Sequence, residues 1–188
     1  SINSFSKTEK FIQEIYWRTY WKGWLEHRPD VYDDYLMQRN ELLKNLSNTT
    51  NYKKTIEGET YLPFFNDWVK KLKKDGYLHN HIRMWFASIW IFTLELPWQL
   101  GANFFMENLL DGDPASNTLS WRWVAGIQTK GKHYLARKNN IIKYGNVDIN
   151  ENIKLNEHAV CLEENKSYFA KDLDLHNSET DDLDSILI

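Results

Sequence analysis

Three groups of polar and aromatic residues interrupt the most apolar part of this chain, and their types could do chemistry. They are segments 76–84, 111–117 and 121–123, which read GYLHNHIRM, DGDPASN and WRW. Buried amides and charges cost free energy unless each finds a partner. We therefore expect these side chains to converge on one another and on a polar, planar ligand.

Near the N-terminus, an acid, a flat aromatic ring and a guanidinium share one helical face. Glu14, Trp17 and Arg18 stand at positions i, i+3 and i+4, which lie on the same side of a helix. Such a set could hold a base-like ligand by its edge. The alternative is a surface Glu–Arg pair beside a core tryptophan.

The first polar group repeats that spacing with Asn80, Arg83 and Met84, and the alternative here is an exposed polar flank. His79 and His81 stand two apart on the same expected helix, so we expect their rings to point in different directions. No third His, Cys or carboxylate stands near them at the spacing of metal ligands. The sequence therefore predicts no metal site.

The second polar group precedes a helix. Asp111 and Asp113 flank a glycine directly before Pro114, a place where aspartates commonly cap helices. Asn117 and Trp121 continue the face of Asp113 in steps of four. An amide both donates and accepts hydrogen bonds, which suits a cofactor whose ring nitrogen changes protonation with its redox state.

The composition excludes several classes of protein. The nine tryptophans can fill a core or relay single electrons, and no Gly-x-Gly-x-x-Gly, P-loop or Gly-x-Ser-x-Gly pattern is present. The one cysteine, Cys161, excludes an internal disulfide framework. No signal pattern opens the sequence, and its longest apolar run, residues 84–98, is too short to span a membrane. We expect a soluble, cytoplasmic protein that makes no membrane contact.

Helical periodicity predicts the elements that position these groups. We expect an all-α, multi-helix bundle. Its first helix would be capped by Ser6 or Thr8 and end before Pro29, and further helices would cover residues 30–46, 63–75, 79–94, 97–110 and 114–128. Residues 47–51 read as a loop, and residues 132–150 as irregular with short β-like patches.

The charge divides the chain into two regions. Residues 1–150 hold 20 Lys and Arg against 16 Asp and Glu, whereas residues 151–188 hold 3 against 10. We expect a helical domain over 1–150 and an irregular acidic tail or linker over 151–188. A mildly basic body permits contact with nucleic acid without requiring it.

Taken together, the polar groups resemble the FAD-binding domain of the DNA photolyase/cryptochrome family, over about residues 9–140. The family writes them as Met-His-Asn-Arg-x-Arg-Met, Phe-Met-x-x-Leu-Ile-Asp-Gly-Asp-x-Ala-x-Asn and Gly-Trp-x-Trp. This chain has LHNHIRM at 78–84, FMENLLDGDPASN at 105–117 and WRW at 121–123, in the same order and at matching spacing. The resemblance implies the fold of the later part of that domain and FAD as the cofactor.

The resemblance also implies roles for individual residues. Arg83 would pair with Asp111 beside the flavin, Asp113 would face the pyrimidine edge of its ring, and Asn117 would face N5. The residues that would contact FAD are Arg18, Asn80, Arg83, Asp111, Asp113 and Asn117. The residues that would hold a pyrimidine dimer are Glu14, Trp17, Asn80, Met84 and Trp123. The inner two members of an electron-transfer chain would be Trp121 and Trp98.

The chain departs from the family pattern in several places. His81 replaces an arginine, and Thr19 replaces a glutamate. No tryptophan lies between Trp24 and Trp68, so the outer member of the electron-transfer chain has no obvious counterpart. This sequence also has no counterpart of two other family features: the α/β antenna domain, and the Thr-Ser-x-x-Ser-type segment that binds the FAD phosphates. We therefore expect a fragment, or a shortened relative with another means of holding the cofactor. The expected partners include a missing N-terminal antenna domain or a partner chain.

The activity implied by the resemblance is blue-light-driven electron transfer from reduced FAD to pyrimidine dimers in DNA, as in a deoxyribodipyrimidine photolyase-type carbon–carbon lyase. One alternative is a cryptochrome-like photoreceptor or redox flavoprotein without repair activity, which would signal through residues 151–188. A second alternative is a helical module that has lost FAD. Glu14 and Trp17 favour repair, whereas His81 and the missing upstream segment favour the photoreceptor.

Overall fold

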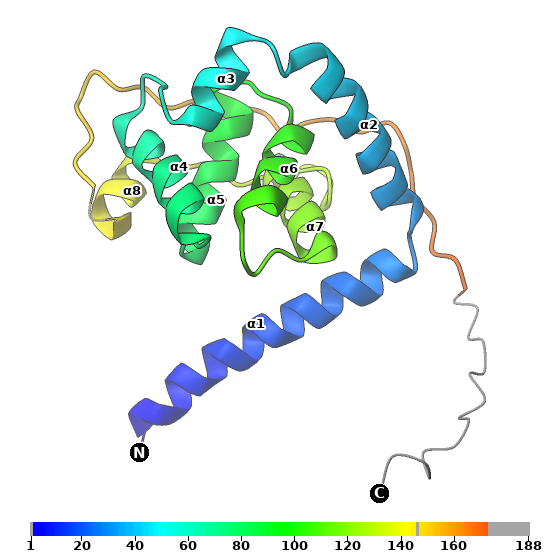
Figure 1. Cartoon of the computed structure of the whole chain (residues 1–188). Coiled ribbons are helices and arrows are strands. Elements are labelled where there is room, and N and C mark those ends of the chain that lie inside the picture. The colour runs from blue at the N-terminus through cyan, green and yellow to red at the C-terminus, as the bar shows by residue number, and fades with distance from the viewer. Residues whose placement is uncertain (1, 146, 173–188) are drawn as a thin grey trace, which may run out of the picture.

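The computed structural model describes residues 2–145 and 147–172. In this part of the chain every regular element is a helix, which confirms the all-α prediction (Figure 1). The elements are α1 (Ile2–Glu26), α2 (Asp30–Leu46), α3 (Thr50–Glu57), α4 (Pro63–Asp75), α5 (Asn80–Ser88), the π-helix η1 (Ile89–Thr93), α6 (Trp98–Asn108), α7 (Pro114–Ala125) and α8 (Lys138–Gly145).

Helices α4 to α7 form an aromatic core. Pro63 begins α4, and Gly76 ends it in the left-handed conformation, φ 64°, that suits a glycine C-cap. Helix α5 and η1 cross the centre of the body, where every side chain from 85 to 92 is buried. Stacked and edge-on rings fill the space between the helices, and they include Phe65, Phe86, Trp90, Phe104, Phe105 and Trp121.

Helices α6 and α7 approach each other closely at a glycine. A Cβ atom on Gly101 would lie 2.3 Å from the ring of Trp121 and 3.0 Å from Nε1 of Trp90. Real Cβ atoms do not come this close to another heavy atom, so the site has room only for hydrogen. Gly101 thus allows Trp121 to lie directly against the backbone of α6.

Several expected boundaries are wrong. The helix expected over 79–94 becomes a π-helix after Ser88, where the N–H of Leu94 donates to the carbonyl of Ile89 at 2.8 Å. Helices α6 and α7 end two and three residues earlier than expected, at Asn108 and Ala125. Helix α1 begins at Ile2, so neither Ser6 nor Thr8 caps it.

Two short helices were not expected. Helix α3 covers part of the expected loop at 47–51, and Thr49 caps it by accepting from the N–H of Tyr52. Helix α8 replaces the β-like patches expected within 132–150, and none of the described residues forms a strand. Both helices are eight residues long. Contacts with the body hold them in place, because Tyr52, Thr55 and Ile141 are buried.

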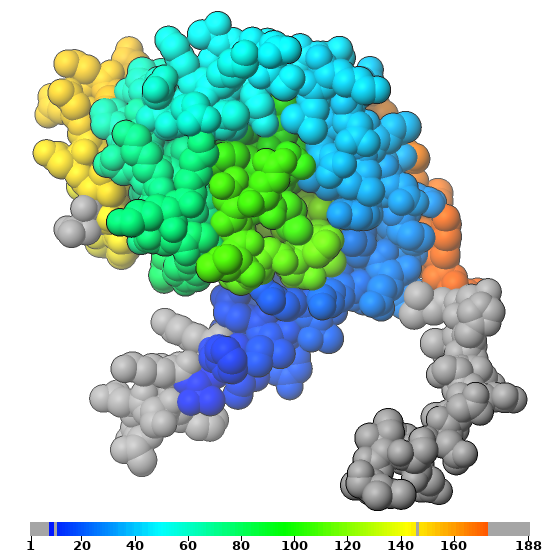
Figure 2. All heavy atoms as spheres, in the orientation of Figure 1, coloured from blue at the N-terminus to red at the C-terminus, as the bar shows by residue number. Residues whose placement is uncertain are grey.

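Helix α1 runs beneath the body, and its N-terminal half extends past it (Figures 1 and 2). The C-terminal half lies against α7, where Trp21 and residues 23–25 are partly buried. The large apolar side chains of the preceding turns are 43 to 70% exposed, and they are Phe11, Ile12, Ile15, Tyr16, Trp17 and Tyr20. Among the described residues, no helix combines the length and apolar character needed to cross a bilayer.

Residues 151–172 form no helix or strand, but they lie along the helical body rather than away from it. The N–H of Leu162 donates to the carbonyl of Ala125 at 2.9 Å, and the N–H of Lys171 donates to that of His27 at 2.8 Å. The side chain of Glu164 pairs with buried Arg122. The rest of the predicted acidic tail, residues 173–188, lies outside the described residues.

Candidate functional site

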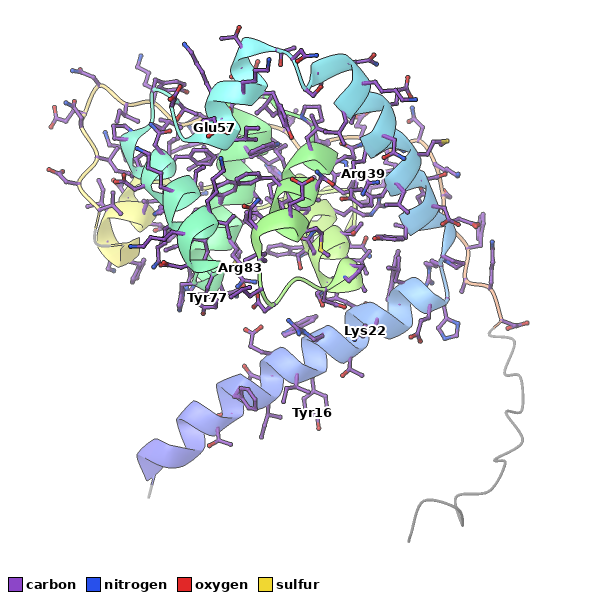
Figure 3. The ribbon with its side chains drawn as sticks, in the orientation of Figure 1. Tyr16, Lys22, Arg39, Glu57, Tyr77 and Arg83 are labelled. Atoms are coloured by element: carbon purple, nitrogen blue, oxygen red, sulfur yellow. The ribbon has the colours of Figure 1, made fainter. Side chains whose placement is uncertain are left out.

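The candidate site lies at one end of the body, where the start of α5 and the α6–α7 loop face α1 (Figure 3). Nη2 of Arg83 on α5 lies 3.0 Å from both carboxylate oxygens of Asp111 in the loop. Nε of Arg83 donates to the carbonyl of Leu78 at 2.7 Å, and Tyr77 lies under the guanidinium, with its ring centroid 5.2 Å away. The pairing of Arg83 with Asp111 was expected from the family resemblance, and the structure contains it.

Two cations of α1 reach the same loop. Nη2 of Arg18 donates to the backbone carbonyl of Asp111 at 3.2 Å. Nζ of Lys22, one turn later, lies 3.8 Å from Oδ1 of Asp113. Lys22 was not among the expected site residues, although its i+4 spacing from Arg18 places both on one face. These contacts attach α1 to the α6–α7 loop and bring Arg18 and Arg83 to the same carboxylate residue.

Asp113 and Asn117 each have a structural role as well. Oδ2 of Asp113 caps α7 by accepting from the N–H and the hydroxyl of Ser116, at 3.0 and 2.7 Å. Nδ2 of Asn117, a residue only 8% exposed, donates to the carbonyl of Ala102 at 2.8 Å and so connects α7 to α6. The Oδ1 atom of Asn117 has no hydrogen bond within the described part of the chain, and it stays available to a ligand.

The two tryptophans proposed for electron transfer are both buried. Trp121, one turn after Asn117, packs edge-on against Phe86, Trp90 and Phe105, and its indole N–H has no partner in the described part of the protein. Trp98 stacks on Tyr35 of α2 with ring centroids 5.5 Å apart. Tyr35 was not expected at this position, and the resemblance gave no signal for it.

The residues expected to hold a pyrimidine dimer are spread over three elements. Glu14 and Trp17 are exposed on α1, and Trp17 touches only Tyr20 and Trp21 of its own helix through its ring. Its 56% exposure excludes the alternative of a core tryptophan.

The other three are on the body. Asn80 is exposed and Met84 half-buried on α5, whereas Trp123 stacks on Tyr134, whose pKa is raised by burial. No described hydrogen bond, ion pair or ring contact joins Glu14 or Trp17 to these three.

The two histidines differ from the prediction. His79 lies just before α5 as its N-cap, and its Nδ1 accepts from the N–H of His81 at 3.3 Å. Their rings therefore stack instead of diverging, with centroids 5.7 Å apart and planes at 15°. The ring of Trp85 lies 5.9 Å from that of His81, with the planes tilted by 31°. Within the described ranges, no group of three or more His, Cys, Asp or Glu residues could hold a metal ion.

Comparison with known proteins identifies the family to which the chain belongs. The model of the FAD binding domain of DNA photolyase matches residues 11–152. The chain belongs to this family. It is 33% identical over 122 residues to the deoxyribodipyrimidine photo-lyase of Streptomyces griseus, covering 64% of this chain and 26% of that one. It is 30% identical over 148 residues to the same enzyme of Buchnera aphidicola, covering 75% and 30%.

The photolyase of Escherichia coli is also similar, at 27% identity over 125 residues, covering 66% of this chain and 26% of that one. The chain thus spans less than a third of the length of these photolyases. No solved structure matches it.

The cofactor of this photolyase domain is FAD, and the side chains at the candidate site fit its chemistry. FAD combines a diphosphate with a flat ring that carries hydrogen-bond donors and acceptors along its edges. The site offers the guanidinium groups of Arg18 and Arg83 for anionic or accepting atoms. It also offers a free amide oxygen on Asn117. A hollow of about 510 Å³ lies elsewhere, beside Trp98 and segment 162–168, and none of the proposed FAD ligands lines it.

Proposed function

We propose that this chain binds FAD between α1 and the body and takes part in light-driven repair of pyrimidine dimers in DNA. The observation that supports the proposal most is that Arg18 and Arg83, 65 positions apart and on different helices, both bond to Asp111. Such an arrangement fixes the loop that carries Asp113 and begins α7. Membership of the photolyase family supports FAD as the ligand of that loop.

The chain's own residues would hold and orient the cofactor. Arg18, Asn80, Arg83, Asp111, Asp113 and Asn117 would contact it. When bound and reduced, FAD supplies the electron that light excites. The Arg83–Asp111 pair would hold a guanidinium and a carboxylate beside the ring in a fixed geometry. The oxygen of Asn117 would meet the ring from the α7 side, while Trp121 closes the core behind it.

A dimer-containing strand would meet residues of α1 and α5. Glu14 would hydrogen-bond the flipped-out dimer, Trp17 and Trp123 would stack on it, and Asn80 and Met84 would line the pocket. The exposure of Glu14 and Trp17 leaves both accessible to such a ligand. Contact with DNA phosphates would make the affinity fall as the salt concentration rises.

The proposal includes a further polypeptide. The chain spans less than a third of its photolyase relatives, and the exposed apolar side chains of α1 have room for one. We propose that an antenna domain or a partner chain covers α1 and supplies contacts to the FAD phosphates. A cytoplasmic location, and the division into a domain over 1–150 and a tail over 151–188, stay predictions.

A second candidate function is a photoreceptor or redox flavoprotein without repair activity. His81 supports it, because its ring stacks on His79 and lies tilted against Trp85 at a position where the family pattern has an arginine. A ring held in a stack offers a weaker contact to a phosphate or a lesion than a free guanidinium does.

The first test measures FAD binding by titrating the purified chain with FAD and recording absorption and fluorescence. Arg83→Ala should weaken FAD binding by about 10- to 100-fold, because it removes a charge-assisted contact and releases Asp111. Arg137→Ala, at an exposed arginine outside the site, is the matched control. Equal affinities for these two variants would contradict the proposed site.

Repair is tested separately by illuminating the FAD-loaded chain with an oligonucleotide that contains a pyrimidine dimer. Glu14→Ala should lower the repair rate and leave FAD binding unchanged. Glu9→Ala removes an exposed carboxylate of the same helix and should leave both unchanged. FAD binding without any repair, in the unaltered chain, would favour the second candidate function.

A further inference from the structure

Trp98 packs against Tyr35 of α2. The sequence has no tryptophan that could serve as the outer member of the expected electron-transfer chain, and this tyrosine lies next to the chain's expected inner member. The rings of Trp98 and Tyr35 are stacked, with centroids 5.5 Å apart and planes at 23°. One turn earlier on α2, the ring of Tyr32 lies 5.6 Å from that of Tyr35, at 39°. Trp98 and Tyr35 are 5% and 2% exposed, whereas Tyr32 is half-buried. These three rings, the aromatic row, lead from the core toward the surface.

The inner end of the aromatic row lies next to the candidate site. Trp98 begins α6, and Gly101 follows one turn later at the point where the ring of Trp121 touches the α6 backbone. Trp121 itself follows Asn117 by one turn of α7. The ring sequence therefore begins beside the proposed flavin position and ends on α2.

Positive charges flank the middle of the aromatic row. The guanidinium of Arg122 lies 5.9 Å from the ring of Trp98, and that of Arg39 lies 5.9 Å from the ring of Tyr35. A nearby cation raises the free energy of a ring that has lost an electron and become positive. Glu164, which pairs with Arg122, offsets part of this effect at Trp98. Glu107 likewise offsets part of the effect of Arg39 at Tyr35.

The two tyrosines differ in what can happen to their protons. Burial raises the pKa of Tyr35 to about 12, because its apolar surroundings disfavour the charged phenolate. A tyrosine that loses an electron is stabilised by losing its proton as well. Half-buried Tyr32 can release that proton to water, whereas Tyr35 is shielded from it.

We infer that Tyr32 is the outermost electron donor of this chain and that Tyr35 is the ring that bridges it to Trp98. The inference rests on the proposed function, because it requires bound FAD. With FAD bound in its oxidised form, Trp121 would pass one electron to the photoexcited ring, which is thereby reduced by one electron, and would regain one from Trp98. Tyr32 supplies Trp98 with an electron across Tyr35 and releases its phenolic proton to water. The resulting neutral Tyr32 radical takes a hydrogen atom from a soluble thiol, which becomes a thiyl radical.

The test uses the FAD-loaded chain without added thiol. Transient absorption and electron paramagnetic resonance after a light pulse distinguish tyrosyl from tryptophanyl radicals. The unaltered chain should give a long-lived tyrosyl signal, and Tyr32→Phe should replace it with a tryptophanyl signal. Tyr35→Phe keeps the bridging ring and should keep the tyrosyl signal, whereas Tyr35→Leu should abolish it. Tyr61→Phe, at an exposed tyrosine outside the aromatic row, is the control.

Each other result overturns a defined part of the inference. A tyrosyl signal that persists in Tyr32→Phe excludes Tyr32 as the donor, and loss of the signal in Tyr35→Phe excludes a purely bridging role for Tyr35. A loaded chain that yields only tryptophanyl radicals overturns the inference and leaves the proposed function intact. A chain that takes up no FAD contradicts the proposed function and this inference together. Circular dichroism of the Tyr35→Leu variant separates a broken row from a lost fold.

Discussion

Helix α1 and segment 151–172 differ in how firmly they are attached to the body, and the difference is the reverse of what their sequences suggest. Helix α1 is regular and rich in aromatic residues, yet the large side chains of residues 11–20 stay exposed. Segment 151–172 has no regular structure and carries mostly polar residues, yet it is bonded to α2, α7 and His27 in the turn between α1 and α2. Specific partners, more than apolar content, therefore decide which segment is held by this body.

Among substitutions in these two regions, the largest expected effect tests the attachment of segment 151–172. Glu164→Ala would leave the guanidinium of Arg122, whose side chain is 4% exposed, without its partner. We expect the free energy of unfolding to fall by about 3 kcal/mol, as for other buried ion pairs that lose one member. Urea unfolding followed by circular dichroism measures this change.

Glu163→Ala is the matched control, because the neighbouring carboxylate is exposed and outside the pair. It should change stability by less than about 0.5 kcal/mol. Equal effects of the two substitutions would mean that segment 151–172 is not held by the Arg122–Glu164 pair.

A smaller effect tests the second anchor of the segment through its pH dependence. The Lys166 ammonium and the Tyr168 hydroxyl bond to Asp34 and hold its pKa below the ordinary 3.8. Because the pKa of Asp34 is lowered in the folded state, its carboxylate stabilises the protein at pH values above 3.8. This contribution is lost as the pH falls from that value through the lowered, folded-state pKa.

Asp34→Asn should therefore destabilise the chain by about 0.5 to 1 kcal/mol at neutral pH, since Lys166 is largely exposed. The difference from the unaltered chain should disappear at acidic pH. Unfolding curves at several pH values measure it, and a difference that is constant with pH would exclude the ionic contribution.

The smallest expected effect concerns α1. Trp17→Ala should change the free energy of unfolding by less than about 0.5 kcal/mol, because the side chain is 56% exposed and, among the described residues, its ring partners Tyr20 and Trp21 belong to its own helix. The same substitution at buried Trp121 should cost about 3 to 5 kcal/mol. A large loss of stability in Trp17→Ala would show that the exposed face of α1 is covered in solution, for example by a second chain.

The sequence predicts the elements that begin and end with strong local signals. Helices α2 and α4 have the expected bounds because Pro29, Pro63 and Gly76 restrict the backbone where each begins or ends. Helix α3 escaped prediction because its sequence, TNYKKTIE, has little apolar periodicity, and it is stabilised by burying Tyr52 and Thr55. The change to π-helix at Ile89 depends on packing in the core, which periodicity does not describe.

At the candidate site, too, some contacts could be predicted from the sequence and others could not. The Arg83–Asp111 pair followed from the family resemblance, since three linked patterns fix both positions. The contact of Lys22 with Asp113 and the stacking of His79 on His81 depend on where α1 and the start of α5 lie in space. The stacking of Tyr35 on Trp98 joins residues 63 positions apart in numbering, and neither helix alone indicates it.

The missing side chain of Gly101 has a consequence beyond the packing of two helices. Even one methyl group there would displace the indole of Trp121 and, through the rigid turn before it, the amide of Asn117. A change of volume deep in the interior would thus reach the first turn of α7, where Asn117 lies. Gly101 consequently tolerates few substitutions, although it is not among the residues proposed to contact FAD.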